Sequence, residues 1–261
     1  PMVLWAIGPA RLDEVAARAA AIVGTRASTA YGEHVPPDLS AGLAERSVGV
    51  VSGGAYGIDG AAHRAALEID GATIAVLGTG IDRAFPVGHR ALQDEIGTRG
   101  VLLSELDRED HGRPFTFPQR NRIIAALAWV VVVVEAPVKS GALGTADIAL
   151  KLGRTIAAVP GPIDPPQSGG SNLLIREGAQ IITSVEDLLA LIGLTPPVRA
   201  ARAAPDSHEG RVWRALADGA ADMHTLCHRS GLPAAQCMAA VTSLELSGSI
   251  ECALNGEIRR R

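Results

Sequence analysis

The sequence predicts an α/β protein whose doubly wound, mostly parallel sheet is followed by a small second domain. Short apolar runs alternate with helical patterns up to residue 194, as in sheets whose parallel strands are joined by helices. Glycine-rich turns follow several of these runs. A polar stretch rich in proline and alanine then leads to three helical patterns and a hairpin signal.

Seven apolar runs are the candidate strands. They are Ala21–Gly24, Val48–Gly53, Thr73–Gly78, Val101–Glu105, Val130–Glu135, Thr155–Pro160 and Ile181–Ser184. Helical patterns lie near residues 31–46, 57–70, 88–98, 118–128, 141–152 and 170–178, and Val185–Leu191 closes the domain. Because parallel neighbours need crossover helices, this alternation predicts a Rossmann-like domain over residues 20–194.

The two ends of the chain differ from this central domain. Since the chain begins with Pro1, we expect residues 1–19 to be the tail of an N-terminal region that this sequence lacks. Residues 195–207 have the composition of a linker. Beyond the linker, helical patterns at Glu209–Ala217, Met223–Ser230 and Pro233–Leu246 precede a hairpin with an Asn255-Gly256 turn, which predicts a winged-helix domain over residues 208–261.

Composition excludes several classes of protein. The net charge is −4, so any site for a polyanion must be a local patch. No apolar stretch approaches the ~20 residues that a membrane span needs, and no secretory signal is present. Cys227, Cys237 and Cys252 form an odd set, which favours reduced thiols and a cytoplasmic location. With His224 and His228 they match no common zinc spacing, so no metal site is expected.

Glycine-rich turns follow three of the candidate strands. They are Gly24-Thr25-Arg26, then Ser52-Gly53-Gly54-Ala55-Tyr56-Gly57, and finally Lys139-Ser140-Gly141. The carboxyl ends of parallel strands meet at one edge of a sheet, and backbone N–H groups in such turns can bind an anion. The three turns therefore predict one shared site for a phosphate-bearing ligand.

The helix that begins near Pro118 adds two arginines. Residues two apart point to different sides of a helix, so we expect Arg120 and Arg122 to do separate jobs, one facing the ligand and one bracing a loop. Phe117 either stacks on a base or belongs to the core.

Two polar residues follow the second glycine-rich turn, and each has two alternatives. Asp59 caps a helix or orients the glycine-rich turn. His63, one turn later, contacts phosphate or is structural.

Common nucleotide-dependent enzymes are not supported. The G-x-x-x-x-G-K-[ST] and G-x-G-x-x-G motifs are missing, and Ser52 and Ser140 have no evident histidine partner. We therefore expect no catalytic residues and no cofactor.

Taken together, the motifs resemble the DNA-processing protein A family. The matching stretches follow in order over residues 20–192: Ala21–Arg26, Ser52–Asp59, Ala75–Gly80, Arg120–Ile124, Val134–Ala136, Ser140–Leu143, Val159–Pro162 and Leu174–Gly178. The C-terminal segment is similar to the winged-helix domain of that family. The resemblance implies a binding protein, not an enzyme, that binds single-stranded DNA, dimerises, protects incoming DNA and helps load the RecA recombinase in natural transformation.

The resemblance also implies site residues. It places DNA at Gly24, Thr25, Arg26, Ser52, Gly53, Gly54, Arg120, Asn121, Arg122, Lys139, Ser140 and Gly141. To these we add Tyr56, Gly57, His63 and Phe117 as candidates. Many members of the family carry arginine where this chain has Tyr56, so the phosphate contact of that arginine is not carried over. Base stacking or a hydroxyl contact by Tyr56 is the alternative at this position. Leu174, Ile175, Ile182 and Leu188 are candidates for a homodimer interface.

Two other functions remain as alternatives. Nucleotide hydrolases of the LOG type use P-G-G-x-G-T-x-x-E, and in the comparable segment Ile148 stands where their glutamate should be, with Asp147 one position away. This argues against hydrolysis but leaves nucleotide binding open. A transcription factor would act through the winged helix, but Pro233–Leu246, its second helix-turn-helix helix, contains no Lys or Arg.

Overall fold

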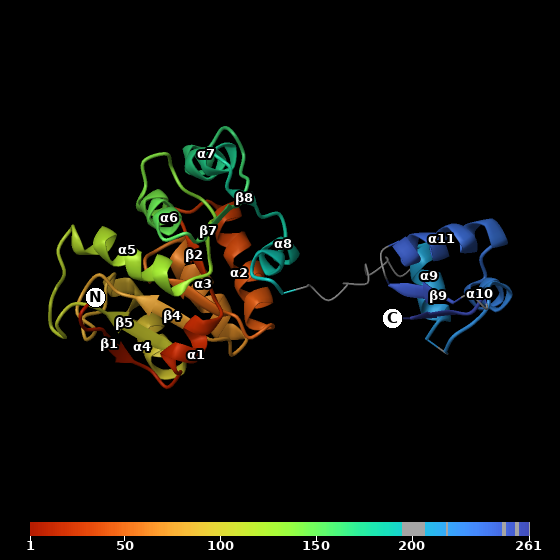
Figure 1. The fold of residues 1–261 in the computed structure, drawn as a ribbon, viewed down its shortest axis with the longest axis horizontal. Coiled ribbons are helices and arrows are strands. Elements are labelled where there is room, and N and C mark those ends of the chain that lie inside the picture. Colours follow the sequence, from red (N-terminus) through yellow and green to blue (C-terminus); the bar gives the residue numbers. More distant parts are fainter. Residues whose placement is uncertain (195–206, 218, 247–248, 254–255, 261) are drawn as a thin grey trace. The chain divides into compact units, whose positions relative to one another are not determined.

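The computed structural model describes residues 1–194, 207–217, 219–246, 249–253 and 256–260. The chain forms two compact units, Pro1–Leu194 and Thr195–Arg261 (Figure 1). Of the expected linker, only Ser207 lies within the described residues. None of the described helices has the length and apolar character that crossing a membrane requires.

An eight-stranded sheet forms the centre of the first unit, in the order β1-β5-β4-β3-β2-β6-β7-β8. The strands are β1 (Trp5–Ile7), β2 (Ala19–Val23), β3 (Gly49–Ser52), β4 (Thr73–Val76), β5 (Val101–Ser104), β6 (Val130–Val133), β7 (Thr155–Ala158) and β8 (Gln180–Ile181). All neighbours are parallel except β1, which is antiparallel to β5. Strand order reverses between β2 and β6, and open α/β sheets bind ligands at such a switch point.

Helices cover both faces of this sheet (Figure 1). They are α1 (Leu12–Ala17), α2 (Ala30–Ala44), α3 (Ile58–Glu68), α4 (Arg90–Arg99), α5 (Thr116–Leu127), α6 (Gly141–Lys151), α7 (Gly169–Arg176) and α8 (Val185–Leu191). Apolar residues of α5 and α6 pack on one face, and those of α2, α3 and α8 pack on the other. Because both faces are covered, β2 to β6 are buried along their whole length, which explains their unbroken apolar runs.

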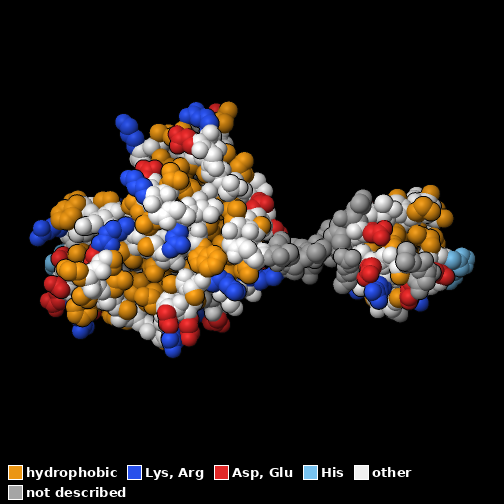
Figure 2. All heavy atoms as spheres, in the orientation of Figure 1, with side chains coloured by type: hydrophobic (Ala, Val, Ile, Leu, Met, Phe, Trp, Pro, Cys, Tyr) orange, Lys and Arg blue, Asp and Glu red, His pale blue; other side chains and the backbone are white. Residues whose placement is uncertain are grey.

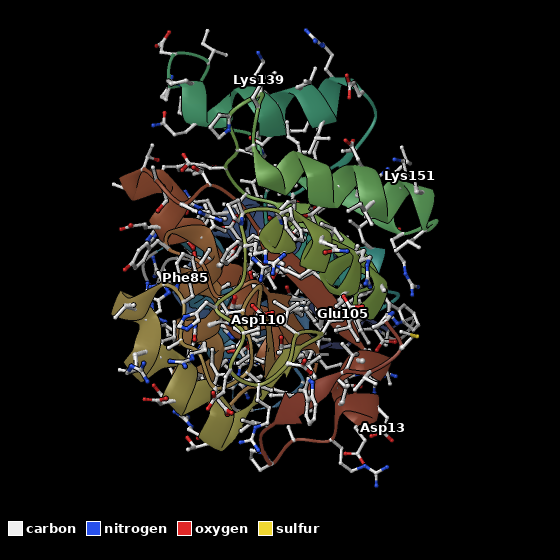
Figure 3. All side chains as sticks on the ribbon, turned by 90° about the vertical axis from the view of Figure 1, so that its left-hand side faces the viewer. Asp13, Phe85, Glu105, Asp110, Lys139 and Lys151 are labelled. Carbon is white, nitrogen blue, oxygen red and sulfur yellow. The ribbon has the colours of Figure 1, made fainter. Side chains whose placement is uncertain are left out.

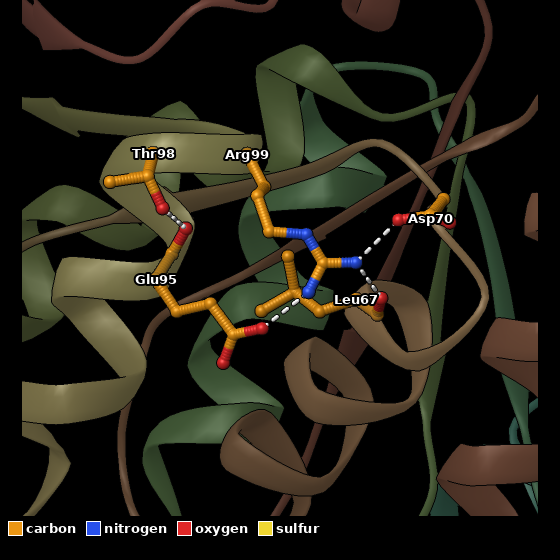
Figure 4. Close-up of polar contacts among 5 residues, drawn as sticks. All are labelled: Leu67, Asp70, Glu95, Thr98 and Arg99. Atoms are coloured by element: carbon orange, nitrogen blue, oxygen red, sulfur yellow. Dashed lines mark hydrogen bonds and ion pairs between the residues drawn. The ribbon is translucent and has the colours of Figure 1, made fainter.

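A charged network fixes α4 to the end of α3 (Figure 4). Arg99 donates hydrogen bonds to the carbonyl of Leu67 and to the carboxylates of Asp70, at 2.6 Å, and Glu95. A cation is favourable beside the last carbonyls of a helix, where the helix dipole is negative. This contact lies at the end of α3 that is away from the glycine-rich turn, so it holds the two helices together and does not involve the turn.

The doubly wound, mostly parallel sheet is confirmed, with one correction at its edge. Residues 1–19 belong to the first unit. Trp5–Ile7 extends the sheet as β1, and Leu12 and Val15 of α1 pack against the core. A three-residue strand and a six-residue helix are too short to give a periodic signal in the sequence.

The described residues of the second unit form three helices and a two-stranded sheet, as predicted for a winged helix. Its elements are α9 (His208–Ala215), α10 (Met223–Ser230), α11 (Ala234–Leu246), β9 (Ile250–Cys252) and β10 (Ile258–Arg260). The strands are antiparallel, and the unit has its own core around Val212, Leu226 and Ile250. Residues 254–255, which include part of the predicted turn, lie outside the described residues.

Candidate nucleic-acid interface

A cavity of about 670 Å³ opens at the switch point between β2 and β6. Loops that follow β2, β3 and β6 line it, together with the first turn of α5. Nine of the predicted DNA-binding residues line this cavity: Gly24, Thr25, Arg26, Phe117, Arg120, Asn121, Lys139, Ser140 and Gly141. The three turns therefore meet at one edge of the sheet, as their positions in the sequence predict.

The loop after β2 is held close to the loop after β6. The Thr25 N–H donates to the carbonyl of Glu135 at 2.7 Å. A Cβ on Gly24 would lie 2.8 Å from that same carbonyl oxygen, so only glycine allows this approach. Arg26 emerges from this packed loop with an exposed side chain, and its guanidinium carbon lies 5.9 Å from the ring centroid of Phe117.

The glycine-rich turn after β3 is satisfied within the protein. Its Gly53 and Ala55 N–H groups donate to Oδ2 of Asp59 at 3.2 and 3.4 Å. Asp59 therefore orients the turn, one of the two roles that the sequence suggests. The expectation that these N–H groups face a phosphate needs correction, because a carboxylate of the chain already occupies them.

Arg120 braces the same turn from the other side. Its side chain is buried and donates to the carbonyls of Gly53, at 2.6 Å, and Val76. Burial lowers the pKa of the Arg120 guanidinium to about 10, and the nearby Asp59 carboxylate opposes this change. Burial likewise raises the pKa of Asp59, and Arg120 again opposes the shift. The two residues form a buried pair that lines the cavity.

Asn121 and Arg122 have structural partners. The Asn121 amide donates to the carbonyl of Gly141 at 3.2 Å and ties α5 to the start of α6. Arg122 donates to both carboxylate oxygens of Glu105 at 2.6 Å and does not line the cavity. Arg120 and Arg122 have different partners, as expected, but both are held within the protein: Arg120 braces the glycine-rich turn and Arg122 pairs with Glu105. Arg122 does not line the cavity and is removed from the candidate DNA contacts.

His63 belongs to the core, which corrects its inclusion among the DNA-contacting residues. Its Nδ1 lies 2.8 Å from Oγ1 of Thr73, whose hydroxyl donates to the Val50 carbonyl. Nδ1 must therefore carry the ring proton, and Nε2 has no hydrogen-bond partner within the described part of the chain. Burial lowers the pKa of His63 to about 3, so the ring is neutral near pH 7.

Ser52, Gly54 and Gly57 set the conformation of the glycine-rich turn. The Ser52 hydroxyl is buried and donates to the Ile22 carbonyl at 2.6 Å. Gly54 and Gly57 adopt φ angles of 69° and 72°, in the left-handed region that favours glycine. Ser52, Gly54 and Gly57 shape the turn, but none of them lines the cavity.

An aromatic recess of about 120 Å³ adjoins the cavity. The rings of Phe85 and Phe117 have centroids 4.8 Å apart, and Gly53 and Tyr56 also line the recess. Tyr56 is exposed and packs edge-on against His89, with ring centroids 4.7 Å apart. Phe85, which follows β4, is not among the residues predicted from the sequence. Only 3% of the residues are aromatic, so a phenylalanine in a loop is the sequence feature that could have indicated this part of the site.

Two exposed cations stand at the cavity. Neither Arg26 nor Lys139 forms an ion pair with a carboxylate in the part of the chain that the structure describes. Ser140 caps α6, and the Gly141 and Ala142 N–H groups precede the first intrahelical hydrogen bonds. Arg26, Lys139 and this helix start form one wall of the cavity whose charge and N–H groups suit an anion, and it is called the anion-binding wall below. Over the face shown in Figure 2, cations are scattered among acidic and apolar side chains and form no broad basic surface.

The candidate dimer residues occupy different environments. Ile182 and Leu188 are buried in the core against α2, so the structure removes them from any interface. Leu174 is partly buried against the other core cluster, and Ile175 is half-buried.

The residues that a nucleotide hydrolase of the LOG type would use lie away from the cavity. Ile148 packs against the core and Asp147 is exposed, and neither lines the cavity. No cluster of three or more potential metal ligands occurs within the described residues.

Two family models match the chain. The model for DNA recombination-mediator protein A matches residues 1–193, and the model for the DprA winged-helix domain matches residues 195–256. The chain belongs to the DNA recombination-mediator protein A family. The family resemblance of the sequence and the winged-helix assignment are thereby confirmed. The match of the fold to two solved structures, given below, agrees with the Rossmann-like sheet of the first unit.

Three relatives illustrate the match to this family. A Mycobacterium tuberculosis protein named as a DNA processing protein DprA is 50% identical over 260 residues, which cover 97% of this chain and 67% of the relative. The DprA structure from Streptococcus pneumoniae has a TM-score of 0.67 and 43% identity, covering 72% of this chain and 65% of that one. The Helicobacter pylori structure, which concerns single-stranded DNA binding by that DprA, has a TM-score of 0.65 and 31% identity, covering 72% of this chain and 85% of that one. The chain thus spans about two thirds of the first two relatives.

Proposed function

We propose that the cavity of the first unit binds single-stranded DNA. One observation carries the proposal: an anion-binding wall and an aromatic recess meet in a single cavity at the switch point of the sheet. Arg26 belongs to both, since it lines the cavity and the recess. The single-stranded DNA binding of the Helicobacter pylori relative supports the same assignment.

The arrangement favours a single strand over a duplex. Phosphates would bind Arg26, Lys139 and the start of α6, which are contacts that carry no sequence information. A base would enter the recess beside Phe85 and Phe117, because aromatic rings stack on any base. Bases of a duplex are already stacked on one another, so their faces are not available to the recess.

The winged helix is assigned a secondary role. The exposed positions of α11 include Gln236, Met238, Thr242 and Ser243, and the helix carries no Lys or Arg. A recognition helix contacts bases and phosphates mainly through cationic and amide side chains. A transcription factor acting through α11 is therefore not favoured.

In the cell, we infer that the protein protects incoming DNA and helps load RecA during natural transformation. Membership of the family supports this role. A site that holds DNA by a few phosphate and stacking contacts is compatible with transfer of the strand to a recombinase.

A salt-dependent titration tests the proposed binding. Two cations at the cavity replace the larger set that the sequence suggested, so the log-log salt slope should be about −1.4, at roughly 0.7 per phosphate contact. Oligonucleotides of equal length, single-stranded and duplex, should be titrated at several salt concentrations. Equal affinity for the two forms at moderate salt would contradict the proposal.

We also propose that two copies associate around α7 and β8. Ile163, Ile175 and Ile181 leave apolar surface there, and Ile163 is 92% exposed. A two-fold contact would let one strand reach two cavities and would raise its affinity through effective concentration.

The oligomeric state can be measured by sedimentation at tens of micromolar. Ile181→Asp should weaken the dimer by about tenfold or more, because a charge is buried in an apolar contact. Ile69→Asp, at an exposed position after α3, is the control and should leave it unchanged. A wild-type protein that sediments only as a monomer would contradict the proposal.

A further inference from the structure

Asp59 places a negative charge inside a cavity that otherwise suits phosphate. It lies in the first turn of α3, is 5% exposed, and lines the cavity. Arg120 and the glycine-rich turn surround it, so its carboxylate is held in place from two sides. None of the proposed DNA contacts involves this carboxylate directly.

The geometry around Asp59 is that of an anion site already filled. In parallel α/β sheets, the turn between a strand and a helix presents its N–H groups, together with the helix start, to a ligand phosphate. Here the Gly53 and Ala55 N–H groups donate to the Asp59 carboxylate. Arg120, the cation nearest to this turn, donates to the Gly53 carbonyl on its other side.

We propose that Asp59 is a specificity-determining residue that acts as a built-in anion. It closes the glycine-rich turn to phosphate and confines ligand phosphates to the wall of Arg26, Lys139 and the start of α6. This inference rests on the proposed function, because it assumes that the cavity binds phosphates.

The consequence is a preference for polymers over free nucleotides. A free nucleotide would gain most from a turn that encloses its phosphate, and like charge on Asp59 repels phosphate from that turn. A DNA strand offers successive phosphates, and these can reach Arg26 and Lys139 without entering the turn.

Backbone amide shifts of the full chain, titrated with inorganic phosphate, test the inference. In the wild type, the Gly141 and Ala142 amides should shift and the Gly53 and Ala55 amides should not. In Asp59→Ala, phosphate should also shift the Gly53 and Ala55 amides, and phosphate affinity should rise at least about tenfold. A merely structural role would lower the stability of this variant without creating a phosphate response.

The outcomes separate this inference from the proposed function. Phosphate shifts at Gly53 and Ala55 in the wild type would overturn the role of Asp59, and this result needs no variant. A folded Asp59→Ala protein with wild-type phosphate affinity would overturn it too. If the wild type does not bind single-stranded DNA, the proposed function is overturned. A gain of phosphate binding in Asp59→Ala would still support the inference that Asp59 fills an anion site.

Discussion

Replacing Arg26 and Lys139 together by alanine is expected to weaken single-stranded DNA binding by about a hundredfold. Each forms a charge-assisted contact to phosphate, and losing one such contact costs about 1.5 kcal/mol, or roughly tenfold in affinity. The effect should be similar for all sequences, because phosphate contacts do not read bases. Fluorescence anisotropy with several oligonucleotides of equal length measures both points.

An arginine and a lysine that lie elsewhere on the first unit control for lost charge. Lys151 lies at the far end of α6 from Lys139 (Figure 3). Arg64 is exposed on α3 and does not line the cavity. The Arg64→Ala and Lys151→Ala pair should change affinity by less than about twofold. If this pair weakens binding as much as the Arg26 and Lys139 pair, binding depends on net charge and the cavity is not the site.

Arg120→Met should destabilise the fold by about 3–5 kcal/mol, since it leaves the buried Asp59 carboxylate without its cation. It also removes the two hydrogen bonds that Arg120 donates to the Gly53 and Val76 carbonyls. Urea unfolding of the first unit measures the change. Asp59→Asn in the same chain should recover part of the loss, because no unpaired charge then remains.

Arg122→Met is the control for this measurement. Its partner Glu105 is 29% exposed and Arg122 is 36% exposed, so their ion pair is screened by solvent and should contribute less than about 1 kcal/mol. Equal destabilisation by Arg120→Met and Arg122→Met would contradict the distinct role of the buried pair.

The sheet could be predicted from the sequence because its strands are buried on both faces. Runs such as Val130–Val133 therefore stand out from the helical patterns between them. The edge strand Trp5–Ile7 could not be predicted in this way, since all three residues are exposed and its position depends on pairing with β5. Likewise, Ile182 and Leu188 have the apolar character of an interface, and only their packing against α2 shows that they are core.

The position of the candidate site could be predicted from the sequence, but the contacts made by its turns could not. The turns at Gly24, Gly53 and Gly141 meet because parallel strands end at one edge. The sequence does not show that Asp59 folds back onto the second turn, or that Arg120 donates to carbonyls of the chain. Both are tertiary contacts, and they turn two predicted ligand-binding features into parts of the scaffold.

The measurement that tests the central claim most directly is single-stranded DNA binding by residues 1–194 alone. This unit should fold without the second, because no core cluster of the described residues spans both units. Its dissociation constant should stay within about threefold of that of the full chain. If residues 1–194 remain folded by circular dichroism and lose more than about tenfold in affinity, the binding site is not the cavity of the first unit.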